Sequence, residues 1–263
     1  MRKLAVVTGA SGGLGEQIAR QLAARGYDLV MVARDQVKME RIASELVAAH
    51  GISAIIEPAD LSQPGSAAML YERLTARGVV PDVFINNAAF GMTGSLINSD
   101  PDQLRGMLQL DVISMTELTL LFGRAMRARG QGHIMIVGSL SAFQPNPNMA
   151  AYGAAKAYAL SFGEAVHVEL APKVIVTVLT PGLMDTGFNA ASGFQTPPGL
   201  RRTMLAPEEV ARIGLDALFA GKSGVVAGRI NAIMAFGSRF LSRHAAAKAA
   251  HRMGQKTTQQ ING

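Results

Sequence analysis

Residues 4–25 have the sequence LAVVTGASGGLGEQIARQLAAR, and this stretch decides the fold. It opens with four apolar residues, two of them valines, which is typical of a buried strand. A glycine cluster follows, after which Leu14, Ile18 and Leu22 recur at helical spacing until Gly26, where a helix would end. The stretch therefore predicts a strand, a glycine turn and a helix.

The same alternation continues along the chain. We expect further strands at 28–33, 53–57, 83–86, 133–137, 174–179 and 224–227, and helices at 36–50, 64–77, 101–129, 151–170 and 207–219. Such alternation predicts an α/β fold with a doubly wound parallel sheet of about seven strands and helices on both faces. We place this domain at 1–228 and a basic helical extension at 229–263. The glycine-rich and proline-rich segment 187–199 predicts a mobile loop over a site.

The composition predicts a soluble protein with a packed core. Of the 263 residues, 49% are hydrophobic, and no stretch reaches the roughly 18 uninterrupted apolar residues that a membrane span needs. The sequence holds no cysteine, which excludes disulfides, thiolate nucleophiles and cysteine metal sites and suits a reducing cytoplasm. The five histidines lack the spacing of metal ligands. We therefore expect a cytoplasmic protein without a metal site.

The positive net charge of the chain lies at one end. Seven Lys and Arg residues fall within 221–263, where Asp and Glu are absent. The rest of the chain holds 18 basic and 19 acidic residues and is nearly neutral. Because nucleic-acid binding proteins usually carry a basic patch on the fold itself, the pattern indicates a basic tail and no nucleic-acid partner.

Two interpretations of this basic tail are open. Arg239 and Arg243 are four residues apart, and Phe236 and Phe240 lie among them, so a helix could present a basic and an apolar surface together. In one interpretation the segment touches anionic lipid or shelters an apolar substrate. In the other it packs on the core and ends in a solvated tail. Glycines at 228, 237 and 254 interrupt a continuous helix and favour the second.

The glycine turn predicts a phosphate-binding site. Gly9, Gly12, Gly13 and Gly15 let the backbone turn tightly and approach a ligand, and the N–H groups and dipole of the following helix attract phosphates. Glycine clusters also occur in plain turns and helix caps. Because this one lies between a predicted strand and a predicted helix, we expect it to bind a dinucleotide.

The residue after the second strand bears on which dinucleotide binds. A carboxylate at this point would hold the ribose hydroxyls of NAD, but the chain has Arg34 there. A guanidinium suits the 2′-phosphate of NADP, because it offers a planar fork of donors and a permanent charge. The other interpretation is a solvated arginine that Asp35 partly neutralises. We favour NADP over NAD.

Tyr152, Lys156 and Ser139 form a candidate catalytic set. A spacing of four puts Tyr152 and Lys156 on one face of a helix. The ordinary tyrosine pKa, near 10, is too high for a base at neutral pH, and a nearby ammonium helps by stabilising the phenolate. Ser139 ends the fifth strand, where its hydroxyl can bind a substrate oxygen. Taken alone, a tyrosine and a lysine at this spacing are more often half-buried packing residues than a catalytic pair.

Together these residues resemble the short-chain dehydrogenase/reductase family over nearly the whole chain. The matching motifs are TGASGGLG at 8–15, Asp60-Leu61, NNA at 86–88, Ser139, YGAAK at 152–156, and Pro181-Gly182 with Thr186. The resemblance implies a single-domain Rossmann-like oxidoreductase that transfers a hydride between NADP(H) and a carbonyl or alcohol carbon. It also implies a homodimer or homotetramer joined through the long helices.

The resemblance assigns roles to individual residues. Tyr152 would be the acid/base, Lys156 would lower the pKa of Tyr152 and hold the nicotinamide ribose, and Ser139 would polarise the substrate oxygen. Asp60 and Leu61 would flank the adenine, Asn87 would line the ribose, and Pro181, Gly182 and Thr186 would lie beside the nicotinamide. The expected cofactor site is Gly9, Ser11, Gly12, Gly13, Leu14, Gly15, Arg34, Asp60, Leu61, Asn87, Tyr152, Lys156, Pro181, Gly182 and Thr186.

One residue departs from the family pattern. The family usually has an asparagine in the long helix before Ser139, where it kinks the helix and helps to hold a water that leads to the lysine. This chain has Asp111. An ionised Asp111 close to Lys156 would favour the ammonium but compete for its charge. We therefore add Asp111 to the candidate catalytic residues and expect a working enzyme with a shifted pH optimum.

The substrate class stays broad. The loops after Ser139 and Pro181 carry Phe143, Met149, Met184, Phe188 and Phe194, which predict a pocket for an apolar small-molecule carbonyl or alcohol. An epimerase or dehydratase on the same fold is an alternative activity. A non-catalytic sensor of dinucleotides is an alternative class. The presence of all three candidate catalytic residues favours the enzyme.

Overall fold

The computed structural model describes residues 2–188, 192–193, 201 and 203–259. Seven parallel strands form one sheet in the order β3-β2-β1-β4-β5-β6-β7. The strands are β1 (Leu4–Thr8), β2 (Asp28–Ala33), β3 (Ala54–Pro58), β4 (Val83–Asn86), β5 (Gly132–Val137), β6 (Val174–Thr180) and β7 (Gly224–Val226). The chain winds outward from β1 to β3 and then returns to the other side of β1 with β4. The doubly wound parallel sheet expected from the sequence is therefore confirmed.

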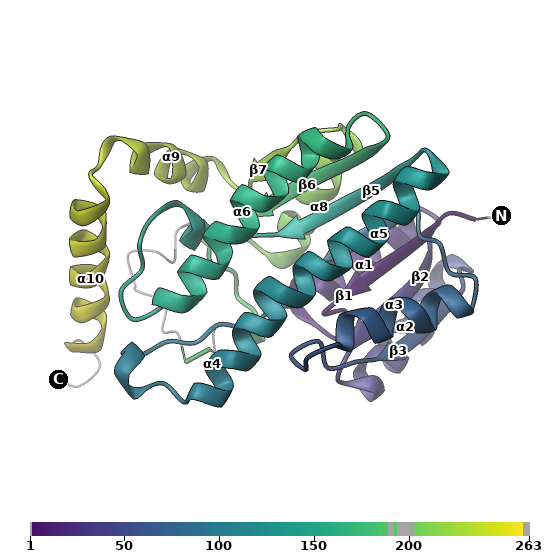
Figure 1. The fold of residues 1–263 in the computed structure, drawn as a ribbon, viewed down its shortest axis with the longest axis horizontal. Helices are drawn as coiled ribbons and strands as arrows, with labels where there is room; N and C mark the ends of the chain where they lie inside the picture. Colours follow the sequence, from purple (N-terminus) through teal and green to yellow (C-terminus); the bar gives the residue numbers. More distant parts are fainter. Residues whose placement is uncertain (1, 189–191, 194–200, 202, 260–263) are drawn as a thin grey trace.

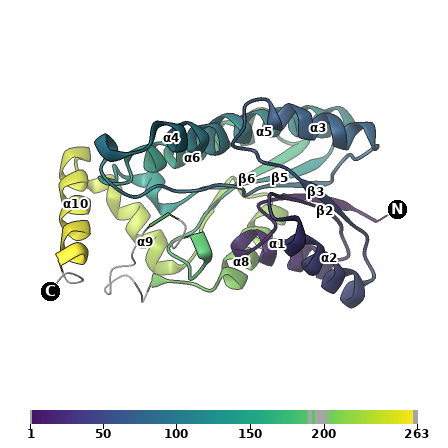
Figure 2. The same ribbon diagram turned by 90° about the horizontal axis from the view of Figure 1, so that it is seen from below.

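Helices cover both faces of this sheet (Figure 2). They are α1 (Gly13–Ala24), α2 (Gln36–His50), α3 (Ser66–Ala76), α4 (Pro101–Leu108), α5 (Met115–Arg129), α6 (Ala150–Leu170) and α8 (Pro207–Phe219). Buried side chains of α1, α2 and α8, such as Ile18, Ile42 and Leu215, pack on one face. Those of α3, α5 and α6, such as Leu70 and Phe122, pack on the other. The sheet is thus enclosed between two apolar cores.

The predicted helix at 101–129 differs in its middle. A π-helical segment, Gln109–Ser114, separates α4 from α5. A π turn holds one residue more than an α turn, and such turns are frequent at functional sites. Asp111 and Ser114 are buried in this segment, and the Ser114 hydroxyl donates to the Leu61 carbonyl at 2.7 Å. The π-helical segment therefore buries two polar side chains inside the protein.

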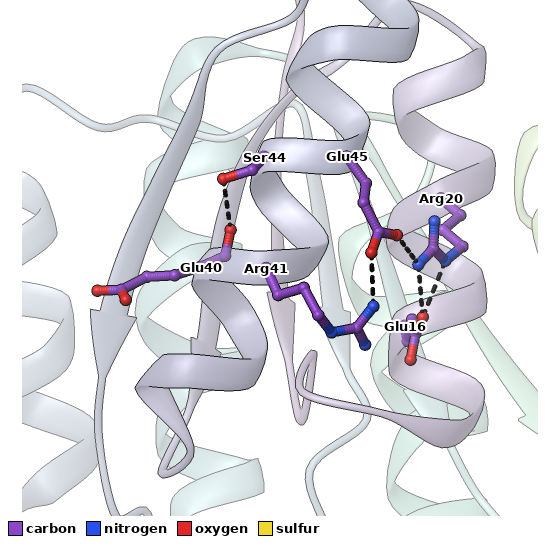
Figure 3. A network of polar contacts seen from close by, with 6 residues as sticks. All are labelled: Glu16, Arg20, Glu40, Arg41, Ser44 and Glu45. Carbon is purple, nitrogen blue, oxygen red and sulfur yellow. Dashed lines mark hydrogen bonds and ion pairs between the residues drawn. The ribbon is translucent and has the colours of Figure 1, made fainter.

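A polar network joins α1 to α2 on the surface (Figure 3). Arg20 forms ion pairs with Glu16 at 2.7 Å within α1 and with Glu45 of α2 at 2.6 Å. Glu45 also pairs with Arg41 at 2.5 Å. These pairs lie at the surface and are partly exposed to solvent, so each contributes little free energy, but they join the two helices that begin at the cleft described below.

The chain ends in two helices at one end of the molecule (Figure 1). They are α9 (Arg229–Gly237), which follows β7, and α10 (Arg243–Gln259). The break between them begins at Gly237, one of the three glycines expected to interrupt a continuous helix. Within the part of the chain that the structure describes, no helix has the length and apolar character to cross a membrane.

Candidate active site

A cleft of about 1020 Å³ opens where β1 to β6 end. In a doubly wound sheet, ligands bind at this edge and beside the strands where the winding reverses, here β1 and β4. The lining includes all fifteen residues expected to bind the cofactor, and Ser139 as well. These are Gly9, Ser11, Gly12, Gly13, Leu14, Gly15, Arg34, Asp60, Leu61, Asn87, Tyr152, Lys156, Pro181, Gly182 and Thr186. The fold thus brings together side chains that lie far apart in the sequence.

The glycine turn between β1 and α1 needs glycine for steric reasons. Gly9 and Gly13 have backbone φ angles of +68° and +56°, which residues other than glycine rarely adopt. A Cβ on Gly15 would lie 2.1 Å from the Gly9 carbonyl oxygen. Gly15 therefore lets the first turn of α1 close against β1, so that the N-terminal end of the helix borders the cleft.

Thr8 and Asn87 hold the turn against β4. The Thr8 hydroxyl accepts hydrogen bonds from the backbone N–H groups of Asn87 at 2.9 Å and Ala88 at 3.0 Å. The Asn87 amide donates to the Thr8 carbonyl at 2.8 Å. Asn86, which precedes it, is buried and donates to the Met115 carbonyl of α5 at 2.9 Å. The two asparagines therefore have different contacts: Asn87 binds the end of β1, and Asn86 binds the backbone of α5.

Arg34 lies at the rim of the cleft, at the end of β2. Asp35 does not neutralise it in the way the sequence allowed, because the Asp35 carboxylate pairs with Lys38 at 2.9 Å and caps α2 by accepting from the Lys38 N–H. Arg34 belongs to none of the ion pairs recorded for the described residues. Its charge nevertheless reaches Asp60. Burial alone would raise the pKa of Asp60, but hydrogen bonds from Ser62 and Gln63 and the charge of Arg34 lower it.

Tyr152, Lys156 and Ser139 converge on the wall of the cleft. The first two are on one face of α6, 6% and 4% exposed, and the Lys156 Nζ lies 5.7 Å from the centre of the Tyr152 ring. Lys156 also donates to the Val137 carbonyl of β5 at 3.3 Å. Ser139 follows β5, where its hydroxyl accepts from the Ser141 N–H at 3.2 Å and lies close enough to lower the pKa of Tyr152. Tyr152 and Lys156 are therefore neighbours on one helix face, as their spacing in the sequence predicted.

Asp111 lies behind this group and is not among the residues that line the cleft. It is 2% exposed, and its Oδ2 is 3.3 Å from the Nζ of Lys156. Its Oδ1 accepts a hydrogen bond from the backbone N–H of Phe90, at 3.1 Å, in the loop after β4. The carboxylate therefore joins three elements: the π-helical segment, α6 and the β4 loop.

Comparison with known proteins shows the family of this chain. The family described as short chain dehydrogenase matches residues 3–195, which is most of the chain. The protein belongs to this family. The resemblance stated from the motifs is confirmed.

Individual relatives are similar over different shares of their length. "Probable oxidoreductase EphD" of Mycobacterium tuberculosis is 32% identical over 74% of this chain, and this chain spans only 33% of that protein. Human "17-beta-hydroxysteroid dehydrogenase type 3" is 32% identical over 71% of this chain and 60% of its own. Among solved structures, the "Short-chain dehydrogenase from Sphingobium yanoikuyae in complex with NADPH" has a TM-score of 0.79 and 27% identity, covering 90% of this chain and 93% of that one.

Burial and the neighbouring charges set the protonation of this dehydrogenase site. Burial raises the pKa of Asp111, and the nearby Lys156 partly opposes that rise. Burial would lower the pKa of Lys156, but the charges of Asp111 and Tyr152 raise it above its ordinary value. Burial also raises the pKa of Tyr152; Lys156 and the Ser139 hydroxyl lower it, and Asp111 raises it further. Asp111 therefore holds the lysine charged but works against ionisation of the tyrosine.

Several apolar side chains border the cleft near Tyr152. Met149, Met184 and Phe188 line it as expected, and the Phe188 ring centre is 5.8 Å from that of Tyr152. Phe143 is not part of the lining. Phe194, and most of the loop expected at 187–199, lie outside the described residues. Apolar side chains therefore border the cleft beside the Tyr152 phenol.

Lys38 and Met234 are among the lining residues that sequence reasoning missed. Lys38 borders the cleft in the first turn of α2, and the place of this turn directly after β2 could have revealed it. Met234 of α9 also lines the cleft. No sequence signal connects it to the site, because only the packing of α9 beside β7 brings it there.

Proposed function

We propose that this short-chain dehydrogenase is an NADP(H)-dependent enzyme that interconverts a carbonyl and an alcohol. The observation that carries the proposal is that Ser139 and the buried Tyr152 and Lys156 all lie on the wall of the cleft. A phenol beside an ammonium and a hydroxyl can exchange a proton with a substrate oxygen. The Sphingobium neighbour, solved with NADPH, supports the choice of cofactor.

The residues of the cleft fit a dinucleotide with a 2′-phosphate. The turn from Gly9 to Gly15 offers backbone N–H groups and a helix N-terminus to the pyrophosphate. Arg34 and Lys38 supply two positive charges at the rim. No carboxylate follows β2 directly to repel a phosphate, and the nearby Asp35 is engaged by Lys38. Asp60, Leu61 and Asn87 would complete the adenosine side, and Pro181, Gly182 and Thr186 the nicotinamide side.

The protein's own groups would handle the proton. In the reductive direction the Tyr152 hydroxyl donates its proton to the carbonyl oxygen, while the Ser139 hydroxyl donates a hydrogen bond to the same oxygen. The ammonium of Lys156 stabilises the phenolate that remains. When bound, the nicotinamide supplies the hydride, or accepts it in the oxidative direction. The apolar lining near Phe188 keeps water away from the reacting carbon.

Asp111 would act through Lys156. Its carboxylate does not reach the cleft, so we assign it as a positioning residue that fixes the lysine and keeps it protonated. Its negative charge also raises the pKa of Tyr152. The pH at which Tyr152 works as a base therefore depends on a residue that does not touch the substrate.

The proposal extends to substrate class, assembly and compartment. The apolar lining favours an apolar carbonyl or alcohol, and the human relative is named for a hydroxysteroid. Exposed apolar side chains on the long helices, among them Leu120 of α5 and Val168 of α6, support a homodimer or homotetramer joined through these helices. The absence of cysteine supports a reducing cytoplasm.

The test is Tyr152→Phe, which removes one oxygen atom. We expect the variant to lose NADPH oxidation with carbonyl substrates but to bind NADPH with an affinity near that of the wild type, measured by fluorescence titration. The matched control is Tyr158→Phe on the same helix, whose exposed hydroxyl hydrogen-bonds Thr116 at 3.0 Å. If both variants turn over equally, Tyr152 is not the acid/base. If the wild type binds NADPH but reduces no carbonyl in a broad screen, the dinucleotide-sensor alternative replaces the enzyme.

A further inference from the structure

Helix α9 exposes its large apolar side chains. The two residues that it buries are Asn231 and Ala235, which are 2% and 5% exposed and lie one turn apart. The exposed members of α9 and of the segment that follows are Ile230, Ile233, Met234, Phe236, Phe240 and Leu241, with exposures between 44% and 77%. We call these six residues the C-terminal apolar surface. An exposed patch of this kind marks an interaction site more often than a scattered exposed residue does.

The packing of α9 explains why it buries small or polar side chains and exposes large apolar ones. The Asn231 side chain donates to the Ala227 carbonyl at 2.7 Å, and a Cβ on Gly182 would lie 2.4 Å from its amide nitrogen. The space between α9 and the end of β6 therefore accepts only small or flat groups. Ala235 follows on the same face, so the bulky residues point away from the protein.

The C-terminal apolar surface is ordered by contacts of its own. The rings of Phe236 and Phe240 meet edge to face with centres 5.4 Å apart. The Arg239 guanidinium lies 5.8 Å from the centre of the Phe236 ring. These contacts hold aromatic and basic side chains together outside the core.

The residues of this surface are interspersed with basic residues along the chain. Arg229, Arg239, Arg243 and Lys248 are exposed, and none of them occurs in the ion pairs recorded within 2–188, 192–193, 201 and 203–259. The chain has no Asp or Glu after Asp216. The C-terminal segment therefore carries positive charge that no acidic residue of the same segment compensates, at the end of the molecule formed by α9 and α10 (Figure 1).

We propose that the C-terminal apolar surface docks on an anionic lipid surface. Aromatic and aliphatic side chains would enter the boundary between headgroups and acyl chains, and the arginines would meet lipid phosphates. A second copy of the chain fits less well, because two such surfaces would bring like charges together and the rest of the chain is nearly neutral. Since Met234 also lines the cleft, docking would bring the mouth of the cleft to the lipid.

The experiment compares the full chain on vesicles of phosphatidylcholine alone and of phosphatidylcholine mixed with phosphatidylglycerol, by co-sedimentation. The apolar variant is Ile233→Ser with Phe236→Ser and Phe240→Ser, and its control is Val37→Ser with Met69→Ser and Ile97→Ser, three exposed apolar residues elsewhere. The charge variant is Arg239→Gln with Arg243→Gln, and its control is Arg124→Gln with Arg127→Gln on α5. Circular dichroism and thermal melting check that each variant folds.

We expect the wild type and both controls to sediment with the anionic vesicles and not with the neutral ones. The apolar variant should stay in the supernatant. Each arginine removed should lower the partition coefficient roughly fivefold, and added salt should weaken binding. If the apolar variant does not fold, the charge variant still decides. Absent binding of the wild type to anionic vesicles, or equal binding of variants and controls, would overturn the proposal. So would a wild-type oligomer that only the apolar variant dissociates, since a second copy would then occupy this surface.

Discussion

Gly15→Ala tests whether the glycine turn is a steric requirement of the fold as well as of ligand binding. Gly15 lies inside the first turn of α1, where an added Cβ would be 2.1 Å from the Gly9 carbonyl oxygen and 2.6 Å from the Asn87 amide nitrogen. The oxygen belongs to the backbone, and the Asn87 side chain is held by its hydrogen bond to Thr8. Neither group can move without shifting β1 or β4 relative to α1.

The cost follows from these contacts. Adding a methyl group to a well-packed site costs about 1–3 kcal/mol, and an overlap with backbone belongs at the upper end, about 3 kcal/mol. The higher helix propensity of alanine offsets about 1 kcal/mol of this. The net loss in the free energy of unfolding is then about 2 kcal/mol. In a chain of this size, that loss lowers Tm by about 4–8 °C.

The measurement is thermal melting by circular dichroism, together with NADPH titration. The control is Gly106→Ala in α4, where the nearest atom to an added Cβ is the Ser62 Cβ at 3.7 Å. It gains helix propensity without an overlap, so its Tm should rise by about 2–4 °C. Gly15→Ala should also weaken NADPH binding, and Gly106→Ala should not. A Gly15→Ala protein that melts at or above the wild type would refute the reasoning.

Three further results are expected. Asp111→Asn removes a charge that raises the pKa of Tyr152, so the rise of alcohol oxidation with pH should move to lower pH; an unchanged pH–rate profile would rule out that influence. Arg34→Ala should raise the KM for NADPH about tenfold or more and leave that for NADH nearly unchanged, because one charge-assisted hydrogen bond is lost. Glu57→Gln weakens two pairs of a buried carboxylate with Arg73 and Arg77, and should lower the free energy of unfolding by about 1–3 kcal/mol in urea melts, whereas Arg20→Ala on the surface should leave it nearly unchanged.

The parts of the site that were predictable from sequence depend on local spacing. Tyr152 and Lys156 share a helix face because they are four residues apart, and the glycine turn lies between a strand and a helix whose patterns are clear. The parallel direction of the strands predicts the other site residues, because every strand of a parallel sheet ends at the same edge. Ser139, Arg34 and Asp60 needed only to follow strands to reach the cleft.

The parts that were not predictable depend on contacts between distant segments. Periodicity indicated one helix through Asp111, whereas the structure has a π turn there, held in part by a hydrogen bond from Phe90. The pattern of α9 suggested that its large apolar residues would pack on the core. The narrow space beside Gly182 admits Asn231 instead, and a hydropathy pattern carries no information about the shape of the surface that a helix meets.

The carboxylate of Asp111 faces two donors, the Phe90 N–H and the Lys156 ammonium, and an amide cannot accept from both with separate oxygens. Its Oδ1 accepts from the Phe90 N–H, and an asparagine oxygen could do the same. Its Oδ2 faces the ammonium of Lys156 at 3.3 Å, and an asparagine would place an NH2 group, which cannot accept, against that positive charge. Direct pairing with the lysine therefore requires aspartate at this position. The π turn, the buried lysine and the acid residue form one consistent unit, and the same charge that fixes Lys156 also makes Tyr152 harder to ionise. The departure from the family pattern thus reaches the Tyr152 phenol in two ways, through the lysine that it fixes and through its own charge.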